Sequence, residues 1–257
     1  SKLNNKDSKL LILFTNSTNT NQEDFLNGIN KVNSKLTVCG GVASSKDSFD
    51  DTYTLLNDEI YSNCAVGISL NSTKLNVKTD FKFNWSAIGI EHTITKSKGN
   101  TVYEIDNMPI IDFYKKYLGD DIIDFLPQDA TTFPILIRKN GNYLARALVG
   151  ILEDGGFEYT APLKEQDKIK LGFGNEEMIL KNPLVETLDK FENAQSFFVY
   201  SCKVRKEQLK KTIKSNEFSN IVNTSGFFTN GEFFILNVKN ELFNQTFTII
   251  DLNEKKL

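Results

Sequence analysis

Apolar and polar positions follow one another along the chain in segments of strand and helix length. Lys9–Phe14 is a continuous apolar run and predicts a buried strand. Asn21–Asp24 then supplies a capping asparagine and two acidic residues, which is typical of a helix start. The apolar face of this helix follows at helical spacing, in Phe25, Leu26, Ile29 and Val32. Thr37–Gly41 returns to a strand pattern and ends in two glycines.

The same pattern predicts further strands and helices downstream. Two paired strands, Asp51–Leu56 and Asn63–Leu70, are expected on either side of a turn at Asn57–Asp58. A helix is expected from Pro109, a residue suited to the first turn, to Gly119, which suits the position after the last turn. The other expected elements are strands at 75–85, 92–95, 101–105, 133–138, 145–152, 156–159, 195–201, 232–239 and 245–252, helices at 178–191 and 203–214, and a loop at 224–232.

The two ends of the chain resemble each other. A shift of 186 positions places the strand at 10–16 on the strand at 196–202 and Gly40 on Gly226, and a shift of 182 aligns AVGISL (65–70) with FTIIDL (247–252). This similarity predicts two related strand–helix–loop–hairpin units, although strand–helix–strand order is common in α/β proteins. If the repeat holds, the two glycine loops lie at equivalent strand ends and face a common cleft, where ligands usually bind.

Composition narrows the class of protein. The 257 residues suffice for one large domain or two small ones, and 40% hydrophobic with 25% charged residues is ordinary for a globular protein. A net charge of −3 gives no reason to expect nucleic acid or an anionic membrane as partner. No apolar run is long enough to span a bilayer, and no signal segment opens the sequence. Three cysteines without paired spacing argue against a disulfide or zinc framework and favour a cytoplasmic setting.

Cys202 and Arg205 lie where the strand ends and the next helix begins. A helix N-terminus and a nearby guanidinium both favour the thiolate, so Cys202 is a candidate nucleophile. A nucleophile of this kind needs a base, and the only histidine, His92, is far away in sequence. Two other interpretations remain open: a buried core cysteine, and capture of an anion with Arg205 as a forked donor.

A second candidate site is the glycine-rich stretch that contains Gly226, Thr229, Gly231 and Glu232. Glycines allow a backbone to approach a ligand closely, but they also simply make turns. Glu232 is expected to accept from an amine or from Arg205. The spacing matches neither a P-loop nor a dinucleotide fingerprint.

His92 is the only histidine, so a site with several histidine ligands is excluded. A single imidazole is still able to act as an axial haem ligand, and the alternative is a half-buried strand residue.

Several motifs, taken in order, resemble the FIST domain, a sensory and intracellular signal-transduction domain of bacteria and of one eukaryotic F-box protein. They are GGVAS (40–44), WSAIG (85–89), residues 92–119, SCKVR (201–205), GFFTNGE (226–232) and NQT (244–246), and the resemblance extends over residues 10–252. Family members usually carry a further segment before the position of residue 10, so the resemblance implies that this opening portion is absent here.

The resemblance implies a ligand-sensing domain of bacterial signal transduction, not an enzyme, and no cofactor. Such domains occur alone or joined to chemoreceptor, histidine kinase or cyclic-dinucleotide output modules. Amino acids have been proposed as ligands, and a subset of the family is similar to haem proteins that sense nitric oxide. Two alternatives therefore stay open: a haem sensor with His92 as ligand, and a cysteine-dependent enzyme using Cys202.

Together these observations predict a mixed α/β or α+β fold with two sheet-containing lobes, outer helices and a division near Gly119, into residues 1–119 and 120–257. A small polar or amino-acid-like ligand is expected in a cleft between the lobes, with Arg205 on its anionic group, Glu232 on its amine and Phe228 covering it. The expected ligand-binding residues are Cys202, Arg205, Gly226, Phe228, Thr229, Gly231, Glu232, Gly40 and Gly41. Neither nucleic acid nor membrane is expected as a partner.

Overall fold

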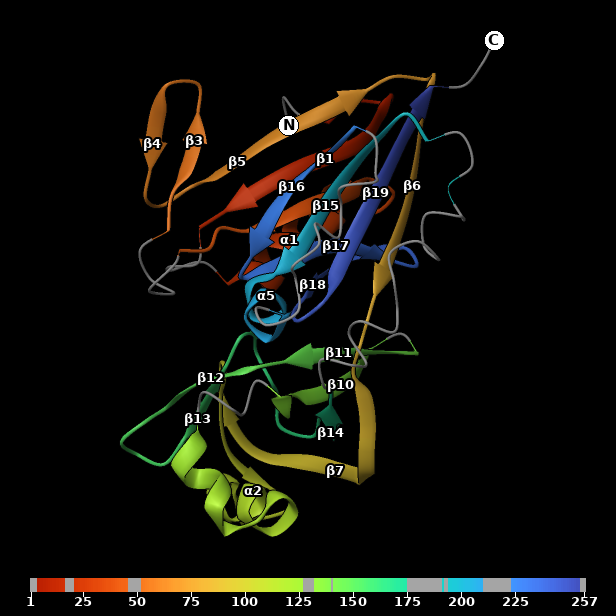
Figure 1. Ribbon diagram of the computed structural model, residues 1–257. Coiled ribbons are helices and arrows are strands. Elements are labelled where there is room, and N and C mark those ends of the chain that lie inside the picture. Colours follow the sequence, from red (N-terminus) through yellow and green to blue (C-terminus); the bar gives the residue numbers. More distant parts are fainter. Residues whose placement is uncertain are drawn as a thin grey trace. The chain divides into compact units, whose positions relative to one another are not determined.

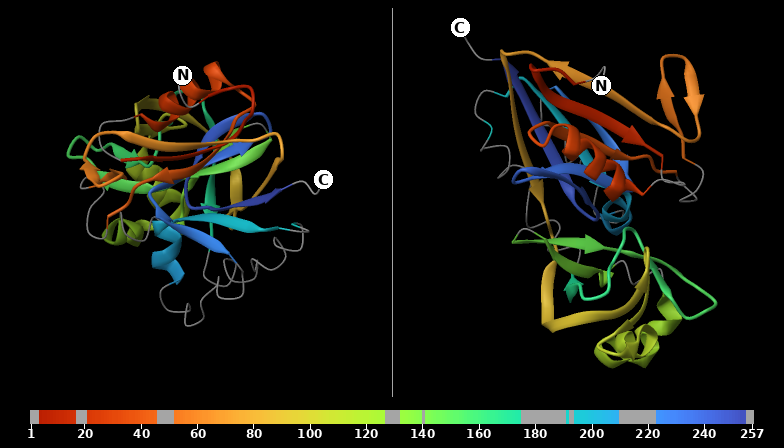
Figure 2. Two further views of the ribbon diagram at one scale, coloured as in Figure 1. Left: turned by 90° about the horizontal axis from the view of Figure 1, so that it is seen from above. Right: turned by 180° about the vertical axis from the view of Figure 1, so that it is seen from behind.

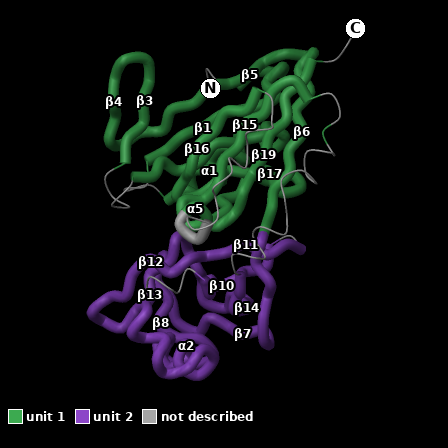
Figure 3. The backbone as a smooth tube through the Cα atoms, viewed as in Figure 1, with its two compact units in different colours: residues 1–83, 179–257 green, residues 84–178 purple. Residues whose placement is uncertain are grey.

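The chain forms two compact units, of which the first is discontinuous in sequence. The computed structural model describes residues 4–16, 21–45, 52–126, 132–139, 141–174, 191, 194–209 and 223–254. Residues 1–83 and 179–257 form the first unit and residues 84–178 the second (Figure 3). The halves 1–119 and 120–257 expected from the sequence are a different division of the chain and stay a prediction.

The first unit contains two sheets and a separate hairpin (Figure 1). The first sheet has the strand order β18 (Lys239–Phe243), β17 (Gly231–Leu236), β2 (Thr37–Val42), β1 (Ser8–Thr15) and β5 (Ala65–Asn71). The second sheet has the order β16 (Thr224–Thr229), β15 (Ser196–Cys202), β19 (Phe247–Glu254) and β6 (Leu75–Lys82). The hairpin consists of β3 (Thr54–Leu56) and β4 (Glu59–Tyr61).

The two sheets of this unit share an apolar core. Alternate residues of a strand point to opposite faces, so one face of each sheet supplies a stripe of large side chains. Leu10 and Ile12 of β1 and Cys39 of β2 meet Tyr200 of β15 and Ile250 of β19 in one buried cluster. The predicted buried strand at Lys9–Phe14 is therefore confirmed as β1.

Helix α1 (Gln22–Val32) covers the outer face of the first sheet, as Figure 2 shows from behind. Asn21 caps it by accepting a hydrogen bond from the Asp24 amide at 3.1 Å, and Leu26 is buried. The predicted capping residue is confirmed, but of the predicted apolar face only Leu26 is buried: Phe25 and Ile29 are partly exposed and Val32 is exposed.

The internal repeat is confirmed by strand register. β1 pairs with β2 in parallel with Leu13 opposite Gly40, and β15 pairs with β16 in parallel with Val199 opposite Gly226. A shift of 186 positions converts the first pair into the second. β5 and β19 then return antiparallel beside β1 and β15. The expected mixed α/β fold is present, with this strand–helix–strand unit occurring twice.

The predicted glycine loops were wrong, because the glycines lie inside strands. Gly40 and Gly41 belong to β2, residues 224–229 form β16, and only Asn230 separates β16 from β17. A Cβ at Gly40 would lie 2.1 Å from the carbonyl oxygen of Leu13, and one at Gly226 1.7 Å from that of Val199. Glycine is therefore needed at these positions because the neighbouring strand lies too close for a side chain. In the sequence, such a glycine looks the same as a glycine in a loop.

The second unit is built on an eight-stranded sheet. Its order is β11 (Asn142–Arg146), β10 (Ile135–Lys139), β14 (Lys168–Phe173), β7 (Ser86–Lys98), β8 (Thr101–Ile105), β13 (Phe157–Tyr159) and β12 (Leu148–Ile151), with β9 (Met108–Pro109) paired to β8. Helix α2 (Ile110–Leu118) begins after Pro109 and ends at Gly119, as predicted, and a 3-10 helix, η1 (Asp120–Phe125), follows. The buried residues of α2 are Ile110, Phe113 and Tyr114.

Two predicted helices are only partly described. The helix expected at 178–191 falls outside the described residues except for Phe191. The helix expected at 203–214 is present as α5 (Lys203–Leu209), and its remaining residues lie outside the described part.

Candidate functional site: a buried corner and an open cavity

The carboxyl ends of both parallel strand pairs meet in the first unit. Asn230, just after β16, donates its backbone N–H to the carbonyl oxygen of Val42 at the end of β2, at 2.9 Å. The Ser44 hydroxyl donates to the carbonyl oxygen of Phe228 at 2.7 Å. Carboxyl ends of parallel strands are the usual place for ligand sites in such sheets. We call Cys202, Arg205, Thr229, Glu232 and Thr246, which lie here, the strand-end corner.

Glu232 is at the centre of the corner and has no exposed surface. Its Oε1 accepts a hydrogen bond from the Thr229 hydroxyl at 2.6 Å, and its Oε2 accepts one from the Thr246 hydroxyl at 2.5 Å. Burial raises the pKa of the Glu232 carboxyl to about 8, although both threonine hydrogen bonds act to lower it. Glu232 is therefore mostly protonated at neutral pH.

Cys202 lies beside this carboxyl and is also buried. The pKa of its thiol is raised to about 12, mainly by burial and to a smaller extent by the charge of Glu232. The amides of Val204 and Arg205 at the start of α5, together with that of Gln245, lower it. The sequence-based argument that a helix start favours the thiolate is thus right in direction, but burial outweighs it.

Arg205, on α5, is buried with its guanidinium over the ring of Phe247, 5.5 Å from the ring centroid. One of its terminal nitrogens lies 3.5 Å from the Ser201 hydroxyl. The corner therefore combines a guanidinium, a protonatable carboxyl and a thiol, all withdrawn from solvent.

Of the remaining predicted site residues, Gly41, Gly231 and Phe228 lie beside the corner. Gly226 and Gly40 instead lie within β16 and β2, opposite Val199 and Leu13. Gly41 lies opposite Glu232 in the sheet, and a Cβ there would lie 2.4 Å from the carbonyl oxygen of Gly231. Lys206 lies over the ring of Phe228, 4.9 Å from its centroid. The structure thus brings together residues from three distant segments that the sequence suggested. Their role in ligand binding stays a prediction.

Sequence reasoning missed the partners at the start of β19 and in the loop before it. Thr246 binds Glu232, and Phe247 stacks on Arg205. The backbone carbonyl of Thr246 also accepts from the Cys202 amide at 3.0 Å. The available signal was the NQT motif at 244–246, which is one of the motifs of the family resemblance.

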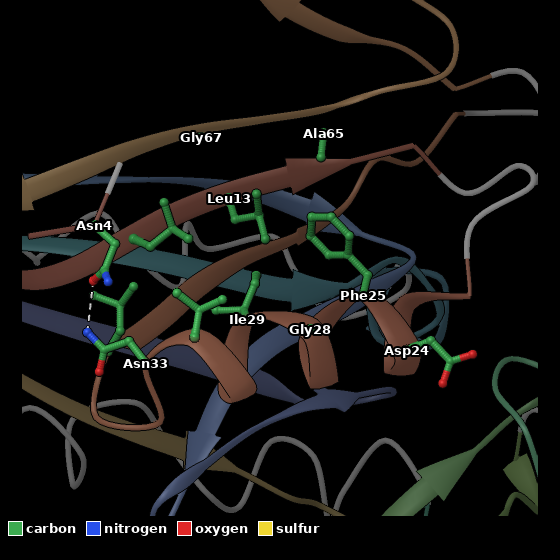
Figure 4. Close-up of a pocket in the computed structure, with 12 residues that line it drawn as sticks. Asn4, Leu13, Asp24, Phe25, Gly28, Ile29, Asn33, Ala65 and Gly67 are labelled. Atoms are coloured by element: carbon green, nitrogen blue, oxygen red, sulfur yellow. Dashed lines mark hydrogen bonds between the residues drawn. The ribbon is translucent and has the colours of Figure 1, made fainter. Parts of the chain in front are cut away.

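An open cavity of about 660 Å³ lies elsewhere in the first unit, between α1 and the β1–β5 edge of the first sheet (Figure 4). Its floor is formed by Leu11 and Leu13 of β1 with Ala65 and Gly67 of β5. The small side chains of β5 leave the space that larger ones would fill. The wall from α1 consists of Phe25, Gly28, Ile29 and Val32.

Polar groups are confined to the ends of the cavity. Asn33 donates a side-chain hydrogen bond to the Oδ1 of Asn4 at 2.9 Å at one end. Asp24 lies at the other end, and its carboxylate points away from the cavity (Figure 4). No lysine, arginine or histidine belongs to the lining, all of which lies within the described residues.

His92 lies in the second unit, on β7, with 3% of its surface exposed. Its Nδ1 lies 2.6 Å from the Oδ2 of Asp106, and its ring meets those of Phe113 and Tyr117 edge-on at 4.9 Å. Within the described ranges, no group of three His, Cys, Asp or Glu side chains is arranged to hold a metal ion. Haem ligation by His92 stays a prediction.

Comparison with known proteins identifies the family. The FIST N domain matches residues 1–108 and the FIST C domain matches residues 111–235, which together include most of the chain. No curated protein and no solved structure matches significantly. Within the part of the chain that the structure describes, no helix has the length and apolar character needed to cross a membrane. The matches confirm the resemblance seen in the sequence motifs: the chain belongs to the FIST family, whose domains are sensory signal-transduction domains.

Proposed function

We propose that the chain is a small-ligand sensor and that its ligand occupies the cavity between α1 and the β1–β5 edge. The observation that carries the proposal is the cavity itself. Its volume of about 660 Å³ is within the range of small-molecule sites, roughly 300–1,000 Å³. Ligand binding there would bias a two-state element of the fold and pass a signal to an output module such as a chemoreceptor, histidine kinase or cyclic-dinucleotide enzyme.

The lining favours an uncharged, mainly apolar ligand with one hydrogen-bonding end. The walls are apolar side chains of β1, β5 and α1, and the Asn4–Asn33 amide pair supplies donors and acceptors at one end. A carboxylate would enter without a cationic partner from the lining, which is costly in an apolar site.

A polar, amino-acid-like ligand at the strand-end corner is the second candidate. It is favoured by the position of Arg205 and Glu232, which both interact with Cys202 at the carboxyl ends of parallel strands. Because Glu232 has no exposed surface, such a ligand requires the corner to open.

Two variants distinguish these sites by titration calorimetry against neutral apolar compounds, their carboxylic-acid counterparts, amino acids and haem. Gly28 lines the cavity, and a Cβ added there would have no atom within 4 Å. The ring of Gly28→Phe therefore has room to occupy part of the cavity. We expect it to weaken binding of a neutral apolar ligand by at least about tenfold, whereas Arg205→Ala leaves that binding unchanged.

Gly28→Ala is the matched control, because a methyl group leaves most of the cavity open. An amino acid whose affinity falls only in Arg205→Ala would place the site at the corner instead. A ligand unaffected by either variant would contradict both sites.

The cysteine-dependent enzyme remains a proposal with a direct test. In a Cys64→Ser chain, Cys39 and Cys202 are the remaining thiols, both buried. Because the pKa of Cys202 is raised to about 12, we expect it to react with iodoacetamide at neutral pH at least about a hundredfold more slowly than free cysteine. Alkylation of Cys202 faster than that of free cysteine would instead support catalysis.

A further inference from the structure

The ends of β2 and β16 contact each other through matching positions of the two repeats. Ser44 donates to the carbonyl oxygen of Phe228, and Asn230 donates to that of Val42. The shift of 186 positions that relates the repeats converts Ser44 into Asn230 and Val42 into Phe228. The two contacts therefore join equivalent positions of the two repeats, although Ser44 donates through its hydroxyl and Asn230 through its backbone N–H.

Each repeat also continues into a hairpin of the same type. β17–β18 turns at Asn237, which has φ 60°, and β3–β4 turns at Asn57, which has φ 54°. Leu236 pairs with Lys239 across the first turn, and Leu56 pairs with Glu59 across the second. The two hairpins thus have equivalent turns and strand registers.

The two hairpins differ in what they pair with. β17 crosses to the first repeat and adds to the edge of β2, with Glu232 opposite Gly41 and Gly231 opposite Val42. An equivalent arrangement of the first repeat would have β3 cross in the same way and add to the edge of β16. Among the described strands, however, β3 pairs only with β4 and β16 only with β15.

Exposed apolar residues mark both of these unfilled positions. Leu55 and Ile60, opposite each other in the β3–β4 hairpin, are 65% and 67% exposed, and Phe227 of β16 is 41% exposed. β16 contains no charged residue and no proline, the devices that usually protect a free strand edge. The other edge strand of the same sheet, β6, carries Lys78 and Lys82.

The connection to the hairpin is longer in the first repeat than in the second. Only Asn230 separates β16 from β17, whereas residues 43–53 separate β2 from β3. The entropy cost of closing such a loop grows slowly with length, so the longer connection does not prevent docking. The first repeat therefore lacks the one-residue connection that holds β17 close to β16 and beside β2 in the second repeat.

We propose that the free edge of β16 is the docking site of the β3–β4 hairpin of the same chain. β3 adds antiparallel to β16, in the register that the repeat dictates: Thr52 opposite Phe227 and Leu55 opposite Thr224. The structure describes the undocked hairpin, and docking extends the second sheet as β17–β18 extends the first. This goes beyond the proposed ligand site and holds whatever the ligand is, because a hairpin with two positions is a two-state element of the kind that a sensor requires.

Disulfide trapping tests this register. In a Cys64→Ser background, Leu55→Cys is combined either with Thr224→Cys or, as a control one residue out of register, with Ser225→Cys. Neighbouring residues of a strand point to opposite faces, so we expect the first pair to oxidise within one chain at least about tenfold faster than the second. Equal rates in the two pairs, or a disulfide found only between chains, would overturn the proposal.

Hydrogen exchange gives a second readout that needs no cysteine pair. Leu55→Lys places a charge that strand pairing at the edge disfavours, and we expect faster amide exchange across residues 224–229. Ile90→Lys is the matched control, because Ile90 is 68% exposed on β7 and belongs to the second unit. Identical exchange of residues 224–229 in the wild-type and Leu55→Lys chains would show that β16 is not covered by the hairpin.

Discussion

Gly226→Ala is expected to destabilise the first unit by about 3 kcal/mol or more, as overpacking between fixed strands does. The added Cβ would lie 1.7 Å from the carbonyl oxygen of Val199 on the neighbouring parallel strand. A backbone oxygen in a paired strand is not able to rotate away as a side chain does, so β15 and β16 have to separate. The measurement is chemical denaturation followed by far-UV circular dichroism.

Two controls accompany this variant. Gly28→Ala places a methyl group where nothing lies within 4 Å, on a helix, and we expect it to stabilise the unit by about 0.5–1 kcal/mol. Trp85, the only tryptophan, belongs to the second unit, so its fluorescence follows that unit separately. An unfolding free energy of Gly226→Ala equal to that of wild type would contradict the close parallel pairing of β15 and β16.

The stability of the first unit is expected to fall as the pH rises from about 5 to 9, by on the order of 4 kcal/mol from Glu232 alone. Burial raises the pKa of this carboxyl from 4.5 to about 8 in the folded chain. Below pH 4.5 both the folded and unfolded states hold the proton, and the contribution is fully present. It is lost as the pH rises through the folded pKa, because ionisation then has to occur in a site without solvent.

Glu232→Gln removes this dependence while keeping the shape of the side chain. Its amide still hydrogen-bonds the hydroxyls of Thr229 and Thr246, which are able to reverse direction. We expect the variant to be more stable than wild type at about pH 9 and similar at about pH 5. If wild type and variant lose the same stability over this range, Glu232 is not the group responsible.

Much of the fold follows from local patterns in the sequence. The apolar run at β1, the capping asparagine and amphipathic face of α1, and the proline and glycine that bound α2 are all determined by residues close together in the chain. The repeat was also visible, because the shift of 186 positions preserves the glycine that faces a carbonyl oxygen in both parallel pairs.

The predictions that failed depend on contacts between segments that are far apart in the sequence. The glycines of β2 and β16 look like loop residues, because nothing local indicates that a neighbouring strand approaches them too closely for a side chain. The burial of Glu232 depends on the pairing of β17 with β2, which lies far earlier in the chain, and on a hydrogen bond from Thr246. The open cavity results from the small residues of β5. Small residues do not change the pattern of apolar and polar positions, so the sequence pattern does not predict a cavity.

The addition of β17 to β2 also has a consequence for synthesis of the chain. A ribosome produces β1, α1 and β2 long before residues 231–243. Until β17 has been made and has paired with β2, the first sheet has an open edge at β2. Open edges of this kind recruit other chains, so the nascent protein is exposed to aggregation for most of its translation. The same geometry explains why cutting the chain near Gly119 would yield an N-terminal fragment without the strands that finish its first sheet.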